Sequence, residues 1–378
     1  MLNNVKQISK NNNAIPVIEP HQAQYYDMIV FSHLRWKFVF QRPQHLIIRM
    51  AQNIKVLFVE EPLRNHQDDK QGTLTEINEN LHILQPNVDH IEDIAVVLPA
   101  FVSNRNISLA WFYSPAFCPL LSVFQFDTII YDCMDELTLF KGAPPQLIEQ
   151  EKYLMANANI IFTGGKSLYE SKKQLHSNVY CFPSSVDQEH FAKAQSNISV
   201  PVDIGDLPTP IVGYYGVIDE RIDLELIAAT ANKLPDVSFV MIGPMAKIEE
   251  SELPKSSNIY YLGMKCYNEL PCYLKAFDVA MMPFALNDAT KFISPTKTLE
   301  YMAAKKPIIS TKITDVVRDY SECLNLVDNA DEFVEAIRNF INKNTDNEWK
   351  EQYEEILERT SWDRTADQMK SIIKIFAR

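Results

Sequence analysis

The sequence predicts an α/β protein built from two tandem doubly wound, Rossmann-like domains that face a cleft. Short apolar runs, typical of strands buried on both faces, alternate with amphipathic stretches along the chain. Residues 193–210 interrupt this alternation with a segment rich in Pro, Ser and Asp, after which the alternation resumes. The length of 378 residues suits two domains better than one.

The first domain is expected at residues 21–195, after an Asn-rich segment, residues 1–20, that we expect to be disordered or extended. Its expected strands are Met28–Phe31, Val56–Glu60, His82–Leu84, Ser108–Tyr113, Thr128–Tyr131, Ile160–Thr163 and Val179–Phe182. Its expected helices are Pro43–Gln52, Pro145–Asn157 and Ser167–Leu175. Apolar strands separated by helices favour a parallel sheet that is covered on both faces.

The expected linker is residues 196–210, and the second domain is expected at residues 211–360. Its expected strands are Ile211–Tyr215, Ser238–Ile242, Ile259–Leu262, Val279–Pro283, Ile308–Ser310 and Leu324–Val327. Its expected helices are Leu224–Lys233, Leu270–Phe277, Pro295–Ala304 and Asp331–Asn342, followed by a charged helix near Asn347–Arg359 and a last helix from Ser361 to Phe376. In such sheets ligands bind at the carboxyl ends of the strands.

Composition narrows the possible functions. A net charge of −13 and a sequence pI of about 5.1 argue against general nucleic-acid binding. The chain has no run of 18 uncharged apolar residues and no apolar segment near its N-terminus, so we expect neither a membrane span nor a signal peptide. Six scattered cysteines without a CxxC motif indicate reduced thiols of a cytoplasmic protein, and no metal site is expected.

The most informative segment runs from Phe284 to Ser310. Ser294 is a candidate N-cap, with Pro295 at the first helical position. The free amides of the first turn, the helix dipole and the Lys297 ammonium would together bind phosphate. Glu300 shares a helix face with Lys297 and suits a ribose diol, so the segment suggests a nucleoside diphosphate site. An ordinary capped helix with a surface ion pair explains the same residues.

Other candidates follow strands of the second domain. Gly216 permits a tight turn, and Arg221 beyond it could clamp a pyrophosphate, although Arg221 also fits a solvated charged turn. Gly243 and Gly263 end two further strands, where a base could contact the backbone. Asn287 lies in the loop before the phosphate helix, where it could bind sugar hydroxyls or cap the loop.

The first domain offers candidates for the opposite side of the cleft. His33, Arg35 and Trp36 follow the first strand, and Gln41 begins the next helix. An aromatic ring can pack on a sugar face while Arg and Gln bind hydroxyls or phosphate. Asp135 follows another strand and could act as a general base or hold a sugar hydroxyl, or could simply be an N-cap.

Together these residues resemble the retaining glycosyltransferases of the group 1 type (family 4-like), which have the GT-B fold. The resemblance lies closest to the bacterial polysaccharide-assembly branch and spans nearly the whole chain. It is carried, in order, by FSHLRWKFVFQRPQHL, YDCMDELTLFKGAP, FTGGKSLYE, FPSSVD, GYYGVIDERIDLELI, YLGMKCYNELPCYL, DVAMMPF, SPTKTLEYMAAKKPIIST and SWDRTADQM. It implies a nucleotide-sugar donor on the second domain, an acceptor on the first, and a last helix, residues 361–378, that completes the first domain.

Residue by residue, the resemblance assigns Glu300 to the donor ribose and Thr296 and Lys297 to the diphosphate. It offers Arg221 for the basic pair that grips the phosphates, although this chain has Val217 where the family usually has Arg. The family also has a first glutamate eight positions before Glu300, and here that position is Phe292. This departure leaves the donor sugar open and weakens the case for retention.

The resemblance implies a metal-independent glycosyltransferase of the hexosyltransferase type without a cofactor, in which Arg221 and Lys297 stabilise the departing diphosphate. Asp135 and His33 are the candidates for orienting the donor sugar or the acceptor. The expected partners are a UDP- or GDP-linked sugar and a glycan or lipid-linked acceptor.

A peripheral contact with the inner membrane surface is also expected. It would involve the patch formed by Trp36, Lys37, Phe38, Arg42 and Arg49. Two alternatives stay open: a nucleotide-sugar epimerase of the same fold, and a non-catalytic sugar-binding scaffold of a polysaccharide assembly complex.

Overall fold

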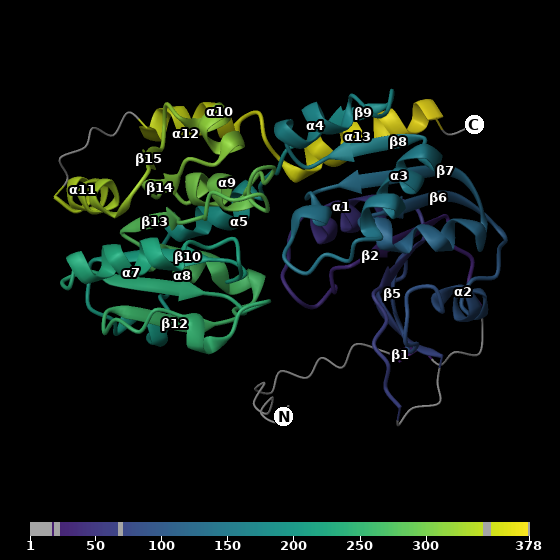
Figure 1. The fold of residues 1–378 in the computed structure, drawn as a ribbon, viewed down its shortest axis with the longest axis horizontal. Helices are drawn as coiled ribbons and strands as arrows, with labels where there is room; N and C mark the ends of the chain where they lie inside the picture. The colour runs from purple at the N-terminus through teal and green to yellow at the C-terminus, as the bar shows by residue number, and fades with distance from the viewer. Residues whose placement is uncertain (1–16, 19–22, 67–70, 343–348, 377–378) are drawn as a thin grey trace.

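The computed structural model describes residues 17–18, 23–66, 71–342 and 349–376, and it has two α/β domains side by side (Figure 1). The expectation for residues 1–20 lies outside these described residues, except that Val17–Ile18 form the short strand β1. Each domain has its own sheet, which confirms the predicted fold class. Within the described residues, no helix has the length and apolar character needed to cross a membrane.

The first domain contains a sheet with the strand order β1-β4-β5-β3-β2-β6-β7-β8-β9. These strands are β1 (Val17–Ile18), β2 (Met28–Ser32), β3 (Val56–Glu60), β4 (Gly72–Asn78), β5 (Leu81–Pro86), β6 (Asn106–Phe112), β7 (Gln125–Cys133), β8 (Ile160–Thr163) and β9 (Val179–Cys181). Apolar side chains from both of its faces form two separate core clusters. The sheet is therefore covered on both sides, as the apolar runs predicted.

The prediction of a wholly parallel first sheet was wrong at one edge. Strand β4 pairs antiparallel with both β1 and β5, whereas the remaining neighbours are parallel. The sequence of β4, GTLTEIN, is fully buried only at Gly72 and Leu74, which lie on one face of the strand. A half-exposed strand with Thr, Glu and Asn resembles a loop in composition, which explains why it was missed.

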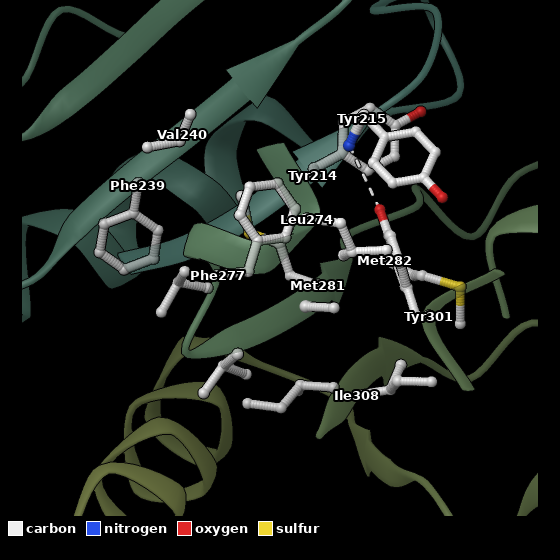
Figure 2. Close-up of a cluster of buried hydrophobic side chains, with 14 of the residues drawn as sticks. Tyr214, Tyr215, Phe239, Val240, Leu274, Phe277, Met281, Met282, Tyr301 and Ile308 are labelled. Carbon is white, nitrogen blue, oxygen red and sulfur yellow. Dashed lines mark hydrogen bonds between the residues drawn. The ribbon is translucent and has the colours of Figure 1, made fainter. Parts of the chain in front are cut away.

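The second domain has a wholly parallel sheet in the order β12-β11-β10-β13-β14-β15. Its strands are β10 (Ile211–Tyr215), β11 (Ser238–Ile242), β12 (Ile259–Gly263), β13 (Val279–Met282), β14 (Ile308–Thr311) and β15 (Asn325–Val327). Phe239, Val240, Met281 and Ile308 from these strands lie in one core with Phe277 (Figure 2). This core fixes the strand ends on which the candidate site is built.

The helices of the two domains surround these sheets (Figure 1). They are α1 (Arg42–Met50), α2 (Ile94–Val97), α3 (Leu147–Asn157), α4 (Lys166–Lys172), α5 (Gln188–Ala192), α6 (Val202–Gly205), α7 (Leu224–Lys233), α8 (Leu270–Ala276), α9 (Thr296–Ala303), α10 (Thr314–Tyr320), α11 (Ala330–Ile341), α12 (Trp349–Leu357) and α13 (Trp362–Phe376). Three-residue helical turns and one longer 3-10 helix, Pro115–Ser122, lie between them.

The last helix, α13, returns to the first domain and packs beside α1 (Figure 1). Trp362 stacks on the imidazole of His45 with ring centroids 4.7 Å apart. The side chain of Arg49 donates to Asp363 at 2.8 Å. Trp362 is buried in the same core cluster as the apolar residues of α1, so α13 belongs to the first domain structurally.

Direct contacts join the domains at α4 and α10. The buried carboxylate of Asp315 accepts hydrogen bonds from the amide of Ser167, at 3.2 Å to each oxygen, and also from the Ser167 hydroxyl. Arg318 pairs with Glu170 at 3.0 Å on the surface nearby. A Cβ at Gly165 would lie 2.5 Å from an Asp315 oxygen, so glycine is needed for this close approach.

Candidate functional site

The helix expected to bind phosphate, α9, begins at Thr296 rather than at Pro295. Pro295 is the N-cap in an extended conformation, with φ −67° and ψ 125°. Ser294 is therefore not the N-cap, and its carbonyl oxygen instead accepts a 2.5 Å hydrogen bond from the Ser184 hydroxyl of the first domain. No side chain caps the first turn of α9 in the described structure, which leaves its free amides available.

The opposite side of α9 is anchored in the second-domain core. Leu299 and Tyr301 are fully buried there. The Tyr301 hydroxyl accepts a 3.2 Å hydrogen bond from the amide of Tyr215 at the end of β10 (Figure 2). Because this side of α9 is held against β10, Lys297 and Glu300 are presented toward the space between the domains.

Glu300 and Lys297 line the same interdomain cavity and perturb each other. The Glu300 carboxylate is buried and accepts a 2.8 Å hydrogen bond from the Tyr215 hydroxyl. Burial raises the pKa of Glu300, while the Lys297 ammonium opposes that shift. Burial lowers the pKa of Lys297. Among the described residues no carboxylate lies within ion-pair distance of the Lys297 ammonium, so this cation is available to an anion.

The interdomain cavity has a volume of about 350 Å³. The second domain lines it with Gly216, Gly243, Lys297 and Glu300, and the first domain with residues 36–40. A smaller hollow of about 90 Å³ shares Val39 and Lys297 with this cavity, and its lining includes Gln41, Asp135, Arg221 and Thr296. Most of the predicted site residues are therefore brought together around two adjoining spaces in the cleft.

Two of the three predicted glycines line the main cavity, and the third does not. Gly243 has φ +147°, and a Cβ on it would lie only 1.8 Å from the carbonyl oxygen of Gly216. The amide of Gly243 donates to the carbonyl of Gly263 at 2.9 Å, which ties the ends of β11 and β12 together. The glycines thus let the strand ends approach closely and leave backbone exposed to the cavity.

Arg221 is held by a neighbouring carboxylate that sequence reasoning treated as part of a solvated turn. Its guanidinium makes a two-pronged contact with Asp219, with nitrogen–oxygen distances of 2.7 to 3.1 Å. Asp219 is buried. This pairing fixes the orientation of Arg221 and leaves part of its guanidinium facing the smaller hollow.

Phe140 and Lys247 were missed by the sequence analysis and lie beside Arg221. Phe140 belongs to the first domain, and its ring centroid lies 5.5 Å from the Arg221 guanidinium and 4.6 Å from the Lys247 ammonium. Lys247 also pairs with Glu220 at 3.2 Å. Nothing in a lone lysine after a Gly-Pro turn signals this role, because the contact crosses the domain boundary. The Phe140 ring of the first domain thus contacts two cations of the second domain, so the positions of both cations depend on how the domains pack.

On the first-domain side, Asp135 and His33 have perturbed acid–base properties. Burial raises the pKa of Asp135, and the Arg221 charge opposes that rise. Burial, assisted by the Lys247 charge, lowers the pKa of His33 to about 4. His33 is therefore neutral at pH 7, and its buried Nδ1 has no hydrogen-bond partner among the described residues.

A buried ion pair supports this side of the cleft. Arg42 makes hydrogen bonds of 2.9 to 3.1 Å to Asp132, and both side chains are almost fully buried. Arg42 also donates to the carbonyl of Phe182 at 2.8 Å. Asp132 is therefore engaged with Arg42, whereas Asp135, three residues further along the chain, lines the smaller hollow.

Arg35 and Trp36 of the first domain line two adjoining spaces. Arg35 donates to Gln85 and to the carbonyl of Glu61, and it pairs with Glu60 at 3.5 Å. Trp36 lines the main cavity, whereas Arg35 lies in a neighbouring groove. Both therefore lie on the first-domain side of the cleft.

Three further features singled out in the sequence have the following surroundings in the structure. Asn287 is exposed and bonds to Thr290 and the Glu220 carbonyl, so it closes its own loop rather than lining either hollow. Phe292 packs against the core of the first domain, so the position where the family has a glutamate serves the domain interface. The expected membrane patch is only partly on the surface, because Lys37 and Phe38 are exposed whereas Arg42 is buried and Trp36 lines the cavity.

Solved structures of other proteins show which fold this chain has. Sucrose-phosphate synthase from Thermosynechococcus elongatus superposes with a TM-score of 0.65 at 15% identity, covering 92% of this chain and 98% of that one. An E. coli trehalose-6-phosphate structure bound with UDP-2-fluoro glucose gives 0.66 at 11% identity, with the same coverage. Anabaena Alr3699/HepE in complex with UDP and glucose gives 0.65 at 11%, covering 93% and 100%. The fold is that of the GT-B glycosyltransferases.

Sequence comparisons narrow the class to a family. Residues 209–343, which contain α9 and the strand ends of the second domain, match the family described as "Glycosyl transferases group 1". A Bacillus subtilis (strain 168) protein named "Putative teichuronic acid biosynthesis glycosyltransferase TuaH" is 24% identical over 304 residues, 74% of each chain. The second domain therefore matches the group 1 glycosyltransferases in sequence, and the chain has the GT-B fold. These findings confirm the resemblance and the assignment as a glycosyltransferase.

Proposed function

We propose that this enzyme transfers a sugar from a nucleoside-diphosphate sugar to a glycan or lipid-linked acceptor in polysaccharide biosynthesis. The observation that carries the proposal is the pairing of Glu300 and Lys297 on α9. A buried carboxylate and an ammonium that pairs with no carboxylate of the described residues line one cavity, a turn apart, beside a helix N-terminus without a side-chain cap there. The ammonium and the helix amides suit the diphosphate, and the carboxylate suits the ribose diol.

The same cations would lower the barrier to transfer. As the bond between the anomeric carbon and the phosphate oxygen breaks, negative charge accumulates on the departing diphosphate. Lys297, the free face of Arg221 and the first amides of α9 lie around the smaller hollow where this charge would form. Preorganised donors at such a point are a large source of catalysis. We propose that these cations and amides stabilise the departing diphosphate without a metal ion.

The first-domain side of the cleft would orient the acceptor hydroxyl and accept its proton. Asp135 lines the smaller hollow opposite Arg221, and its raised pKa makes it a stronger base than an exposed aspartate. Neutral His33 can bond a sugar hydroxyl without adding charge. We further propose that the anomeric configuration is retained, as the resemblance implies. The configuration can be read from the proton coupling constant at the anomeric carbon of the product.

A thermal-shift panel of UDP, GDP, ADP, CMP and dTDP tests the donor site first. A ligand that binds the folded state raises the unfolding midpoint with the logarithm of its concentration. We expect one diphosphate, UDP or GDP, to raise the midpoint of the wild type. Glu300→Gln should lose most of the rise, whereas the control Glu335→Ala, an exposed helical residue, should keep it. No rise with any nucleotide would contradict the proposal.

Donor turnover then separates transfer from epimerisation. We expect slow release of the nucleoside diphosphate from the matching nucleotide sugar, with no interconversion of free nucleotide sugars by NMR. Excess EDTA should leave the rate unchanged, and a rate restored only by Mg²⁺ or Mn²⁺ would refute metal independence. The relative named for teichuronic acid biosynthesis supports a role in polysaccharide synthesis. Teichuronic acid fragments are therefore the first acceptors to test in a transfer assay.

A further inference from the structure

A groove of about 360 Å³ on the first domain continues from the interdomain cavity. The two spaces share Trp36, Lys37 and Ile77 in their linings, so a ligand can extend from one into the other. The groove lies over the carboxyl ends of β3 and β5 and along β4. Its volume is within the range of small-molecule sites, in addition to the space already available for the donor.

The wall formed by β4 presents unused hydroxyl groups. Thr73, Thr75 and Ile77 alternate along this strand and therefore point to the same side of the sheet. Neither threonine hydroxyl has a hydrogen-bond partner within the described part of the chain. A strand that offers two free hydroxyls and one apolar group at regular spacing suits a chain of sugar rings, which carry hydroxyls around an apolar ring face.

The opposite wall is held rigid. The amide of Trp36 donates to Glu60 at 2.7 Å, its carbonyl accepts from Gln44 at 3.0 Å, and its ring packs edge-on against Phe58 at 5.1 Å. One nitrogen of Arg35 is engaged with neighbouring side chains and the Glu61 carbonyl, while the Arg35 side chain as a whole stays 37% exposed. The groove thus combines a fixed aromatic ring with donors and acceptors already in place, which limits the ordering cost of binding.

We propose that this groove binds an oligosaccharide acceptor, with the reacting sugar directed toward the cleft and at least one further sugar along Thr73 and Thr75. This inference rests on the proposed transferase function and goes further by assigning chain length as a determinant of acceptor recognition. The enzyme would then elongate an existing glycan rather than glycosylate a monosaccharide.

Binding to an array of defined mono- and oligosaccharides, in the presence of the stabilising nucleoside diphosphate, tests this proposal. We expect the wild type to bind a subset of oligosaccharides more tightly than their terminal monosaccharides. Thr73→Val and Thr75→Val keep the branched shape and remove one hydroxyl each. Each should weaken oligosaccharide binding roughly two- to tenfold, with little effect on the monosaccharide.

The control variant is Thr365→Val on α13, away from the groove, which should bind like the wild type. Retained nucleotide stabilisation shows that the donor site is intact in every variant. If the nucleotide binds but no glycan does, if monosaccharides bind as well as oligosaccharides, or if both valine variants bind normally, the groove assignment is overturned while the transferase proposal stands. Failure of nucleotide stabilisation in the wild type would instead remove the transferase proposal.

Discussion

The hydroxyl of Tyr215, at the end of β10, donates a 2.8 Å hydrogen bond to the carboxylate of Glu300 on α9. The amide of the same tyrosine donates to the hydroxyl of Tyr301, one residue further along α9. Two hydrogen bonds from one residue therefore fix the rotation of α9 relative to the sheet. Glu300 is held in the cavity wall as a result, so the geometry of the proposed donor site depends on this contact between strand and helix.

Glu300→Gln and Tyr215→Phe should separate binding from positioning. Removing the carboxylate charge should weaken nucleoside diphosphate binding by about 1.5–3 kcal/mol, because a charge-assisted bond to the ribose is lost. Tyr215→Phe should cost less, about 0.5–1.5 kcal/mol, since Glu300 remains but is no longer oriented. Calorimetric titration measures both. Equal affinity in wild type and Glu300→Gln would show that this carboxylate does not contact the nucleotide.

Lys297→Met and Arg221→Met should reduce the rate of transfer more than they reduce donor binding. Each removes a positive charge from the space where the diphosphate develops charge, so we expect kcat to fall about 100- to 1000-fold. Steady-state kinetics of diphosphate release give this directly. Lys255→Met, at an exposed position of the second domain, serves as the control. A raised KM with an unchanged kcat would instead show that the two cations contribute to donor binding and not to the transfer step.

Phe140→Leu should impair the enzyme although Phe140 lies outside both hollows. The ring contacts the Arg221 guanidinium and the Lys247 ammonium across the domain boundary. Cation–π contacts contribute about 0.5–2 kcal/mol each, so leucine should raise the donor KM and lower kcat together. Phe140→Tyr keeps an aromatic face and should restore both constants. Failure of tyrosine to rescue would indicate a packing defect instead.

Asp315→Ala should loosen the domain arrangement. It removes the acceptor for both the amide and the hydroxyl of Ser167 and leaves these groups unpaired. We expect the free energy of unfolding to fall by about 1–3 kcal/mol in denaturant titrations. Small-angle scattering should show a larger radius of gyration. Asp236→Ala breaks an exposed pair with Arg338 and should change stability by no more than about 1 kcal/mol.

The pH dependence of stability should carry a contribution from His33. Its pKa is about 4 in the folded protein, compared with an ordinary value of 6.5. Between these pH values the unfolded state binds more protons, so the free energy of unfolding decreases as the pH falls from about 6.5 to about 4. His33→Gln should flatten this slope, and exposed His66→Gln should not. Parallel slopes for wild type and His33→Gln would contradict the shifted pKa.

The sequence alone predicted the fold class and most elements, because periodicity is a local property. The spans Val56–Glu60, Ile160–Thr163, Ile211–Tyr215 and Leu224–Lys233 match the structure residue for residue. Each is an apolar strand or a sheet-packed helix, for which burial and local pattern agree. Strand β4 was missed because only one of its faces is buried.

Some features of the candidate site could likewise be predicted from the sequence, and others could not. Lys297 and Glu300 were found from the sequence because the chemistry lies within one helical turn, where spacing alone places both on one face. Contacts between distant segments gave no such signal. Arg42 with Asp132 spans 90 residues, and Phe140 reaches Lys247 only when the two domains are packed together.

The sequence by itself therefore determined the two-domain α/β architecture, the helix proposed to bind phosphate and the resemblance to group 1 glycosyltransferases. Only the tertiary structure decided where α9 begins, that Phe292 packs at the domain interface, and that Asn287 closes its own loop. The physical reason is the distance along the chain between the residues that interact. Helix and strand patterns depend on neighbours along the chain, whereas cavities, buried ion pairs and interdomain contacts depend on residues that only folding brings together.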